Sequence, residues 1–249
     1  MKTVYLFDVD GTLTPSRQEI DEEFASVFLD WAERDSKEIY LVSGSDIKKI
    51  KQQLFGAFLD RLAGIFCCTA NELYRKDKLV YENKFTAPAQ LLEDLEIYLS
   101  EAQYHIKTGN HIEQRPGMIN FSVVGRNATL SQREAYTKWD EDVREREDVV
   151  VYITENYPEL DASIGGATSV DIYPLGRDKS QVVQYLKDYY KEEISMVFLG
   201  DKNIPGGNDY PLAMALEEDP NSHWFQVTSY EETRAFIEYS KLFIGEGGV

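Results

Sequence analysis

Hydrophobic residues in the first seventy positions occur as short runs that alternate with stretches of helical spacing. Residues 3–9 form an apolar run that predicts a fully buried strand, and residues 39–42 and 65–68 predict two more. Residues 20–31 carry apolar side chains three or four positions apart, as one face of a helix does. A capping-box sequence at 16–19 predicts the start of that helix. Strands that alternate with helices favour a parallel α/β sheet.

The pattern changes after about residue 72. Short alternating segments predict a hairpin over 73–81, and apolar and polar positions alternate along 118–124. Strands are also predicted at 149–154 and 169–174, with two helices in the same part of the chain. Mostly hairpin-like strands with two helices indicate a separate α+β module.

Parallel α/β character returns near residue 178, where a helix, an apolar strand at 196–199 and a C-terminal helix follow one another. We therefore predict one α/β core that a second module interrupts. The predicted core comprises residues 1–83 and 176–249, and the inserted α+β domain comprises residues 84–175.

Composition and charge narrow the range of partners. Of 249 residues, 43% are hydrophobic, which is enough for a sizeable core, and the formal net charge is −18. Such a surface repels nucleic acid and anionic lipid, so we expect neither as a partner. The adjacent Cys67 and Cys68 predict buried thiols in a reducing cytoplasm rather than a disulfide. We expect no signal peptide and no membrane span, because no apolar run approaches about 18 residues.

An acidic pair followed by a glycine stands at the end of the first predicted strand. Residues i and i+2 of an extended strand point to the same face, so Asp8 and Asp10 can converge on one cation, and one of them can attack phosphorus. The alternative is an ordinary Asp-Gly turn that uses the aspartates locally. Asp201 is a third acid at the end of an apolar strand. Together, Asp8, Asp10 and Asp201 could hold Mg²⁺, which prefers oxygen ligands.

Other polar residues near strand ends supply what phosphoryl transfer requires. Asn208 and Asp209 lie on a glycine-rich loop after Asp201 and suit indirect or water-mediated metal contacts. Lys179 can neutralise both an incoming phosphate and the attacking carboxylate, and Ser43 can donate hydrogen bonds to phosphate oxygens. Taken alone, Lys179 would be an ordinary surface lysine and Ser43 a turn residue. Their joint order along the chain favours a phosphoryl-transfer site.

These segments resemble the four motifs of the haloacid dehalogenase-like (HAD) superfamily. The resemblance implies that Asp8 is the nucleophile phosphorylated by substrate and that Asp10 is the general acid and base. It also implies that Lys179 and Ser43 bind the transferring phosphoryl group and that Asp201 holds Mg²⁺. The implied fold is a Rossmann-like core, a parallel sheet with helices on both faces. The inserted module is similar to the type-2 (C2b) cap of this superfamily.

A closer resemblance runs along nearly the whole chain, from about residue 4 to about residue 240. It is to the eukaryotic-type phosphomannomutases, which interconvert mannose 6-phosphate and mannose 1-phosphate, some of them also accepting glucose phosphates. The resemblance implies an isomerase with an aspartyl-phosphate enzyme and a hexose 1,6-bisphosphate that is both intermediate and activator. The segments that carry it are 8–17 (DVDGTLTPSR), 113–120 (EQRPGMIN), 125–126 (GR), 164–171 (IGGATSVD) and 200–209 (GDKNIPGGND).

A mutase must hold two phosphates, and the one remote from Asp8 needs cations in an otherwise acidic protein. Arg115, Arg126 and Arg133 are spaced across one predicted sheet of the cap and the first turn of its helix. Guanidinium groups bind phosphate bidentately, which lysine does less well. Residues 169 and 171 share one face of their predicted strand. By resemblance, the residues that contact substrate are Arg17, Arg115, Arg126, Arg133, Ser169 and Asp171.

Two other functions stay open. A sugar-phosphate phosphatase of the same superfamily would use the same aspartates, although the cap arginines favour the mutase. A non-catalytic sugar-phosphate-binding protein is the other alternative, against which the complete acidic and lysine set argues. The resemblance also implies a homodimer formed through the cap. The sequence departs from the family at Ala70-Asn71-Glu72, where Glu-Asn-Gly is usual, and this concerns the geometry of the turn.

Overall fold

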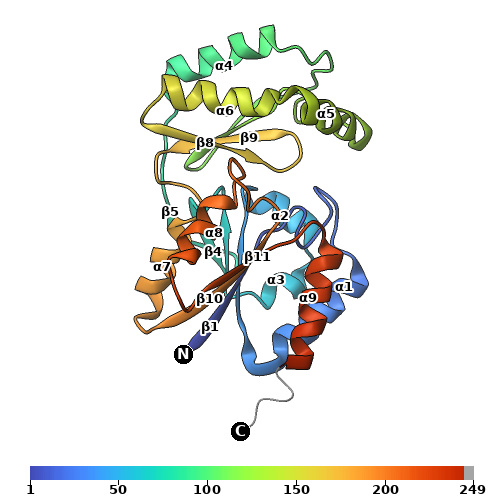
Figure 1. Cartoon of the computed structure of the whole chain (residues 1–249), viewed down its shortest axis with the longest axis vertical. Helices are drawn as coiled ribbons and strands as arrows, with labels where there is room; N and C mark the ends of the chain where they lie inside the picture. Colours follow the sequence, from blue (N-terminus) through green and yellow to red (C-terminus); the bar gives the residue numbers. More distant parts are fainter. Residues whose placement is uncertain (244–249) are drawn as a thin grey trace.

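Two β-sheets organise the chain in the computed structural model, which describes residues 1–243 (Figure 1). The larger sheet consists, in spatial order, of β11 (His223–Gln226), β10 (Ile194–Gly200), β1 (Lys2–Phe7), β2 (Glu38–Val42), β3 (Gly64–Cys67), β4 (Glu72–Arg75) and β5 (Lys78–Glu82). The strands from β11 to β3 are parallel, and β4 and β5 form an antiparallel hairpin at the edge. The predicted parallel α/β core is therefore confirmed.

Helices cover both faces of this sheet, because successive side chains of its central strands enter different hydrophobic cores. Ile39 and Leu41 of β2 point into one core, and Tyr40 and Val42 point into the other. The helices over the first core are α1 (Glu22–Glu33), α2 (Ile47–Gln53), α3 (Gly56–Asp60) and α9 (Tyr230–Phe243), with a 3-10 helix (Arg34–Ser36) after α1. Those over the second core are α7 (Gln181–Tyr190) and α8 (Tyr210–Glu217), on the opposite side in Figure 1.

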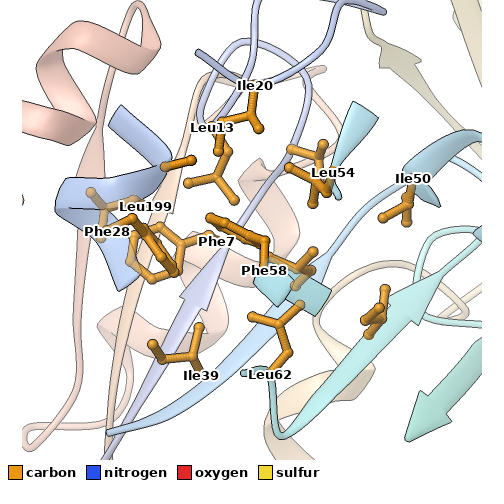
Figure 2. Close-up of a cluster of buried hydrophobic side chains, with 14 of the residues drawn as sticks. Phe7, Leu13, Ile20, Phe28, Ile39, Ile50, Leu54, Phe58, Leu62 and Leu199 are labelled. Atoms are coloured by element: carbon orange, nitrogen blue, oxygen red, sulfur yellow. The ribbon is translucent and has the colours of Figure 1, made fainter. Parts of the chain in front are cut away.

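An aromatic cluster fixes α1 and α3 against β1 (Figure 2). Phe28 of α1 stacks on Phe58 of α3 with ring centroids 4.6 Å apart, and it meets Phe7 of β1 edge to face at 5.3 Å. Trp31 contacts both Phe7 and Phe28. All four rings are buried. Phe28 joins the two helices to the strand, because it contacts the other three rings.

The smaller sheet lies in the middle of the chain and is antiparallel. Its strands are, in spatial order, β6 (Ile112–Arg115), β7 (Met118–Phe121), β9 (Ser169–Pro174) and β8 (Leu160–Gly165). The helices on its face away from the larger sheet are α4 (Ala89–Glu101), α5 (Leu130–Val143) and α6 (Glu145–Asn156) (Figure 1). The boundaries of core (1–83 and 176–249) and cap (84–175) stay a prediction, and both names are kept below.

Residues 149–154 are helical, and the strand predicted there is wrong. They form the middle of α6, where Val149 and Ile153 are four positions apart on one helical face and are buried against the cap sheet. The β-branched run favours a strand locally, but packing against the sheet decides the structure. The strand in this region is β8 (Leu160–Gly165), which was not predicted although apolar and polar residues alternate from Leu160 to Ile164.

Helix α1 begins later than the capping box at 16–19 predicts. Its N-cap is Asp21, whose carboxylate accepts a hydrogen bond from the Phe24 amide at 2.8 Å. The earlier segment cannot start a helix, because Arg17 has a φ of +60° and donates its amide to Asp10 Oδ1 at 2.6 Å. In this segment the Arg17 amide therefore binds Asp10 instead of starting a helix.

The two chain crossings between core and cap lie side by side. Asn83, just before the cap, donates to Gln181 Oε1 at 2.9 Å and to Asn71 Oδ1 at 3.2 Å. Asn71 in turn donates to the carbonyl of Arg177, just after the cap, at 3.2 Å. Residues 68–70, which precede Asn71, all have positive φ although none is glycine. This left-handed turn places Asn71 between the two crossings, in the segment that departs from the family pattern.

The adjacent cysteines are buried thiols, as the sequence predicts. Cys67 and Cys68 are free thiols buried at the end of β3, and burial raises the pKa of both. They are therefore protonated and unreactive at neutral pH. Among the helices of residues 1–243, none has the length and apolar character that a membrane crossing requires.

Replacement of Phe28 tests the role of the aromatic cluster. We expect Phe28→Ala to lower the free energy of unfolding by about 3–5 kcal/mol, because it leaves a cavity between two helices and a strand. The measurement is equilibrium unfolding in urea. As control, Tyr239→Ala removes an exposed ring of α9 and should change this free energy by less than about 0.5 kcal/mol. Equal effects of the two substitutions would contradict the assignment.

Candidate active site

The carboxyl ends of three parallel strands bring predicted residues to one edge of the larger sheet. Asp8 follows β1, Ser43 follows β2 and Asp201 follows β10. Because parallel strands end at the same edge, segments far apart in sequence meet there. The Asp8 amide donates to the Leu199 carbonyl at 3.0 Å, and the Ser43 amide donates to the Phe66 carbonyl at 2.9 Å. The sheet itself therefore fixes the backbone of both residues.

Lys179 has no exposed surface and lies between two carboxylates. Its Nζ is 2.8 Å from Asp8 Oδ1 and 2.6 Å from Asp209 Oδ1. Burial by itself lowers the pKa of a lysine, but the charges of Asp209 and Asp8 raise the pKa of Lys179 above its usual value. The turn before α7 holds it in place, because Asp178 Oδ1 accepts from the Ser180 amide at 2.7 Å. Lys179 is therefore an ammonium in direct contact with the predicted nucleophile.

Asp8, Asp201 and Asp209 form an acidic cluster in which one carboxylate oxygen of each residue lies within 4.8 Å of the others. Burial raises the pKa of Asp8 well above its usual range against the opposing charge of Lys179, and burial and Asp209 raise the pKa of Asp201 to about 7. Three carboxylates beside one ammonium leave excess negative charge, which a divalent cation would neutralise. The cluster is compatible with Mg²⁺, which binds oxygen ligands of this kind.

Asp10 does not join this cluster, although the sequence predicts it as a metal ligand. Strand β1 ends at Phe7, so the alternation that would place Asp8 and Asp10 on one face stops before it reaches them. Asp209, predicted only as an indirect contributor, is fully buried with its carboxylate in the cluster. The acidic cluster in the structure is thus Asp8, Asp201 and Asp209, and Asp10 as a metal ligand stays a prediction.

The Asp10 carboxylate is held by donors outside the cluster. Its Oδ1 accepts from the Arg17 amide at 2.6 Å and from Gln53 Nε2 at 2.9 Å, and its Oδ2 accepts from Ser45 Oγ at 3.4 Å. Gln53 Nε2 is itself held by Thr14 Oγ1 at 3.0 Å. Asp10 is partly exposed and lines a pocket. A carboxylate that is fixed in place and open to a ligand suits proton transfer.

Gly11 explains why a glycine follows the acidic pair. Its φ is +86°, and a Cβ at this position would lie 2.6 Å from Asp201 Oδ2. Any side chain here would collide with the Asp201 carboxylate. Residues 8–11 therefore form both a turn and part of the site. The Asp-Gly turn and the acidic site, which the sequence analysis gave as alternatives, are both present.

A pocket between core and cap connects these groups with residues predicted to bind substrate. The core residues that line it are Asp8, Asp10, Ser43, Gly44, Ser45, Lys49 and Asn208. The cap residues that line it are Arg115, Asn120, Arg126, Gly165, Gly166, Ser169 and Asp171. Lys179 and Asp209 lie behind Asp8, outside the lining. Most of the predicted site residues thus meet at one pocket.

Glu113 bridges two arginines of this pocket. Its carboxylate contacts Arg115, and its Oε2 is 2.9 Å from Arg126 Nη2. Arg115 also reaches the core, where its Nη1 donates to the Gly44 carbonyl at 2.7 Å. Although burial acts in the opposite direction, the arginines lower the pKa of Glu113. Glu113 is therefore an ionised carboxylate that positions both guanidinium groups, a role that the sequence did not reveal.

Asp171, Asn120 and Arg126 form a hydrogen-bonded chain on the cap sheet. Asn120 Nδ2 donates to Asp171 Oδ1 at 2.7 Å, and Arg126 Nη1 donates to Asn120 Oδ1 at 2.8 Å. The same Nη1 lies 3.4 Å from Ser169 Oγ. Asn120 and Asp171 are register partners in β7 and β9, so strand pairing fixes the chain. Ser169 and Asp171 share the face toward the pocket, as their spacing predicts.

Arg17 and Arg133 lie beside the pocket rather than in its lining. Arg133 Nη1 donates to Thr168 Oγ1 at 2.8 Å inside the cap. Burial and the charge of Arg133 lower the pKa of Arg17 to about 10, and burial and Arg126 lower that of Arg133 to about 10. The predicted substrate arginines therefore repel one another, which a bound anion would relieve.

Three candidate functional residues on or just before α2 were not predicted from the sequence. Ser45, Lys49 and Gln53 are four positions apart, so they share one face of the helix. Ser45 and Gln53 contact Asp10, and Ser45 and Lys49 line the pocket. The polar spacing is visible in the sequence, but its meaning depends on which face of α2 meets the cap.

The loop that carries Asn208 and Asp209 is joined to the cap through the backbone. The Ile164 amide of β8 donates to the Gly206 carbonyl at 2.8 Å, and the Asn208 amide donates to the Ile164 carbonyl at 3.2 Å. The position of the cap is thereby coupled to the loop that brings Asp209 to Lys179.

Known proteins with similar sequences are phosphomannomutases. A family model described as eukaryotic phosphomannomutase matches residues 27–243. Phosphomannomutase 1 of Dictyostelium discoideum is 34% identical over 97% of this chain and 96% of its own length. The phosphomannomutase of Saccharomyces cerevisiae is 35% identical over 85% of each chain.

Solved structures share the fold at lower identity. A phosphatase of the haloalkanoate (HAD) superfamily from Bacteroides thetaiotaomicron has a TM-score of 0.58 and 16% identity, and the match covers 98% of this chain and 95% of that one. The C-terminal domain of the C. albicans trehalose-6-phosphate phosphatase has a TM-score of 0.62 and 18% identity, over 92% and 80%. These structures confirm the predicted HAD-type fold.

Removal of the Lys179 ammonium would leave Asp8 and Asp209 buried without their shared cation. At about pH 8 in EDTA, we expect Lys179→Met to lower the free energy of unfolding by about 3–5 kcal/mol. The loss should shrink toward about pH 5. A carboxyl whose pKa is raised by folding destabilises the fold above that pKa, and protonation removes this penalty as the pH falls. Urea unfolding at both pH values measures the effect.

Two further variants complete this test. Adding Asp209→Asn to Lys179→Met should recover part of the loss, because one uncompensated buried charge disappears. Lys48→Met, at an exposed lysine of α2, should change the unfolding free energy by less than about 0.5 kcal/mol. A Lys179→Met variant as stable as Lys48→Met would show that the buried ion pair does not stabilise the fold.

Proposed function

The chain belongs to the eukaryotic phosphomannomutase family, and on this premise we propose that it interconverts mannose 6-phosphate and mannose 1-phosphate. The observation that carries the proposal is a pocket with the Asp8 carboxylate in one wall, the Lys179 ammonium behind it, and arginines in the other wall. A mutase needs this arrangement, because its bisphosphate intermediate has a phosphate at each end of the sugar. Glucose phosphates, which differ from mannose phosphates at one hydroxyl, are proposed as further substrates.

Asp8 is the proposed nucleophile. Its carboxylate forms a bond to phosphorus while the bond from phosphorus to a sugar oxygen of hexose 1,6-bisphosphate breaks, which leaves an aspartyl phosphate and a hexose monophosphate. The Lys179 ammonium, 2.8 Å from Asp8 Oδ1, orients the carboxylate and offsets negative charge. The Ser43 hydroxyl at the end of β2 donates to a phosphoryl oxygen.

Asp10 is the proposed acid and base. It gives a proton to the sugar oxygen that leaves phosphorus, and in the return step it takes the proton from the hydroxyl that attacks phospho-Asp8. The hydrogen bonds from Ser45 and Gln53 hold its carboxylate at the pocket. The attack on phospho-Asp8 forms the bisphosphate, which reorients before Asp8 attacks the phosphate at its other end. The result is isomerisation with the enzyme phosphorylated again.

Residues of the cap and its border are proposed to hold the sugar and the phosphate remote from Asp8. Guanidinium groups fit phosphate oxygens, and repulsion among them favours binding of a dianion. Asp171, whose carboxylate accepts a hydrogen bond from Asn120, suits a contact with a sugar hydroxyl. The proposed contacts are Arg17, Arg115, Arg126, Arg133, Ser169 and Asp171.

We propose that Mg²⁺ binds the acidic cluster of Asp8, Asp201 and Asp209. When bound, the ion would offset negative charge on the transferring phosphoryl group. Asn208, buried at the pocket next to Asp209, suits a contact through water. We also propose that hexose 1,6-bisphosphate is the activator, since it phosphorylates Asp8 in the step described above.

A phosphatase is the second candidate, because water that reaches the aspartyl phosphate would release inorganic phosphate. Contacts that hold the cap on the core support the mutase instead. Arg115 donates to the Gly44 carbonyl, and the backbone of Ile164 pairs with the loop at 206–208. Both contacts would hold the cap over the pocket in the phosphorylated enzyme and so limit the access of water to Asp8.

The deciding assay uses mannose 1-phosphate with and without glucose 1,6-bisphosphate. We expect mannose 6-phosphate to form, with the bisphosphate strongly increasing the rate, because it primes Asp8 with a phosphoryl group. Isomer formation and free phosphate are measured in the same samples. Steady release of phosphate without isomer would establish the phosphatase and refute the mutase.

Asp8→Asn provides the control on the chemistry. The amide is a poor nucleophile, so the rate should fall by more than about 10³-fold while the fold is kept. Asp142→Asn, at an exposed position of α5, should keep the parent rate. An unchanged rate in Asp8→Asn would remove Asp8 as the nucleophile.

We further propose that two chains associate through the cap. Large apolar side chains are exposed on the cap helices, among them Ile97, Leu130 and Val151, each about half exposed. Light scattering should give a mass about twice the 28.6 kDa of one chain. A mass of 28.6 kDa at micromolar concentration would refute the dimer.

A cytoplasmic location stays a prediction.

A further inference from the structure

Helix α2 turns a row of polar side chains toward the active-site pocket. Its N-cap, Asp46, accepts a hydrogen bond from the Lys49 amide at 2.9 Å and so fixes the first turn. Ser45, Lys49 and Gln53 share one face, and the outer two hold Asp10. Lys49 lies between them and lines the pocket, and the proposed chemistry above gives it no role.

Lys49 belongs to the core but lies in the electrostatic field of the cap. The positive charges that act on it most strongly are those of Arg115 and Arg126, followed by Arg17. Glu113 attracts it, but this carboxylate already pairs with Arg115 and Arg126. Within the described part of the chain, no carboxylate lies at ion-pair distance from the Lys49 ammonium. An ammonium at Lys49 would therefore have no compensating negative charge beside it.

This environment disfavours the ammonium form of Lys49. Burial, and then the charges of Arg115 and Arg126, lower the pKa of Lys49 to about 6. An anion in the pocket would reverse the balance, because it attracts the ammonium and screens it from the arginines. The position of Lys49 and its missing partner both point to an anionic ligand.

We propose that Lys49 donates a hydrogen bond to the same phosphate that Arg115 and Arg126 hold. The core and the cap would then each supply cations to one phosphate, and the complete phosphate site would exist only with the cap on the core. A charge-assisted hydrogen bond from an ammonium to phosphate is short and strong. The inference rests on the proposed function for the identity of the sugar, and the pocket geometry supports the anion site by itself.

Proton uptake follows from this role. At about pH 7.5 the amine of free Lys49 is mostly neutral, and a phosphate dianion beside it raises its pKa so that it gains a proton. Other ionisable groups at the pocket already have hydrogen-bond or ion-pair partners of their own. Those groups are Asp8, Asp10, Glu113, Arg115, Arg126 and Asp171.

Kinetics of three variants separate charge, shape and location. With mannose 1-phosphate and glucose 1,6-bisphosphate, Lys49→Gln should raise KM about 10- to 100-fold and change kcat less than about threefold. The reason is that the bond to a non-reacting phosphate is equally present in ground and transition states. Lys49→Arg keeps the charge and should recover most of the loss. Lys48→Gln, at the exposed neighbour on the same helix, should match the parent.

Titration calorimetry measures the proton directly. Inorganic phosphate and mannose 1-phosphate are each titrated at about pH 7.5 in two buffers of different ionisation enthalpy. The parent should take up about one proton more per phosphate bound than Lys49→Gln, and it should bind about 10- to 100-fold more tightly. A merely structural role of Lys49 would not change proton uptake. Lys49→Met replaces Lys49→Gln should the latter fail to fold.

The outcomes distinguish this inference from the proposed function. Unchanged KM, phosphate affinity and proton uptake in Lys49→Gln would overturn the inference, and so would a parent that binds neither phosphate nor mannose 1-phosphate. A parent that binds phosphate with Lys49-dependent proton uptake but forms no mannose 6-phosphate would refute the mutase and leave the phosphate site in place.

Discussion

The ion pair of Lys179 with two buried carboxylates is the contact on which the rest of the site depends. An ammonium without exposed surface is stable only where nearby charge compensates its lost hydration, and Asp8 and Asp209 do so here. These carboxylates follow β1 and precede α8, and the lysine precedes α7. The three segments meet only because the parallel sheet places β1 beside β10 and ends both at one edge. The order of the strands therefore brings the Lys179 ammonium and its two carboxylate partners together.

The cap side of the pocket, which faces Asp8, concentrates positive charge in an acidic protein. A chain of formal charge −18 repels phosphate at long range, yet its cap brings Arg115 and Arg126 together at one pocket. Glu113 ties Arg115 and Arg126 into fixed positions, and part of their repulsion remains unbalanced. A dianion recovers that energy and a neutral sugar does not. The charge of this wall therefore favours an anionic ligand over a neutral one.

The sequence predicted the α/β core because its strands are buried on both faces, where apolar runs alone decide the structure. It failed where a local pattern competes with long-range contacts. The β-branched residues around Val149 form a helix because that helix packs on a sheet, and the capping box at 16–19 is replaced by the contact of Arg17 with Asp10. In the sequence, Lys49 cannot be told from a surface lysine of an amphipathic helix. Only the tertiary structure places it near the charges of the cap arginines. Spacing reveals which side chains share a face, and packing decides what that face meets.

The chain leaves the core for the cap and returns at one place, where Asn71 is hydrogen-bonded both to Asn83 and to the carbonyl of Arg177. A module whose two ends lie side by side can be lengthened, exchanged or removed without displacing a strand of its host. The core could therefore keep its phosphoryl chemistry through evolution while caps of different recognition were inserted at the same point. For engineering, the pair of positions 83 and 177 is a natural graft site, since a foreign cap needs only two neighbouring ends to be joined there.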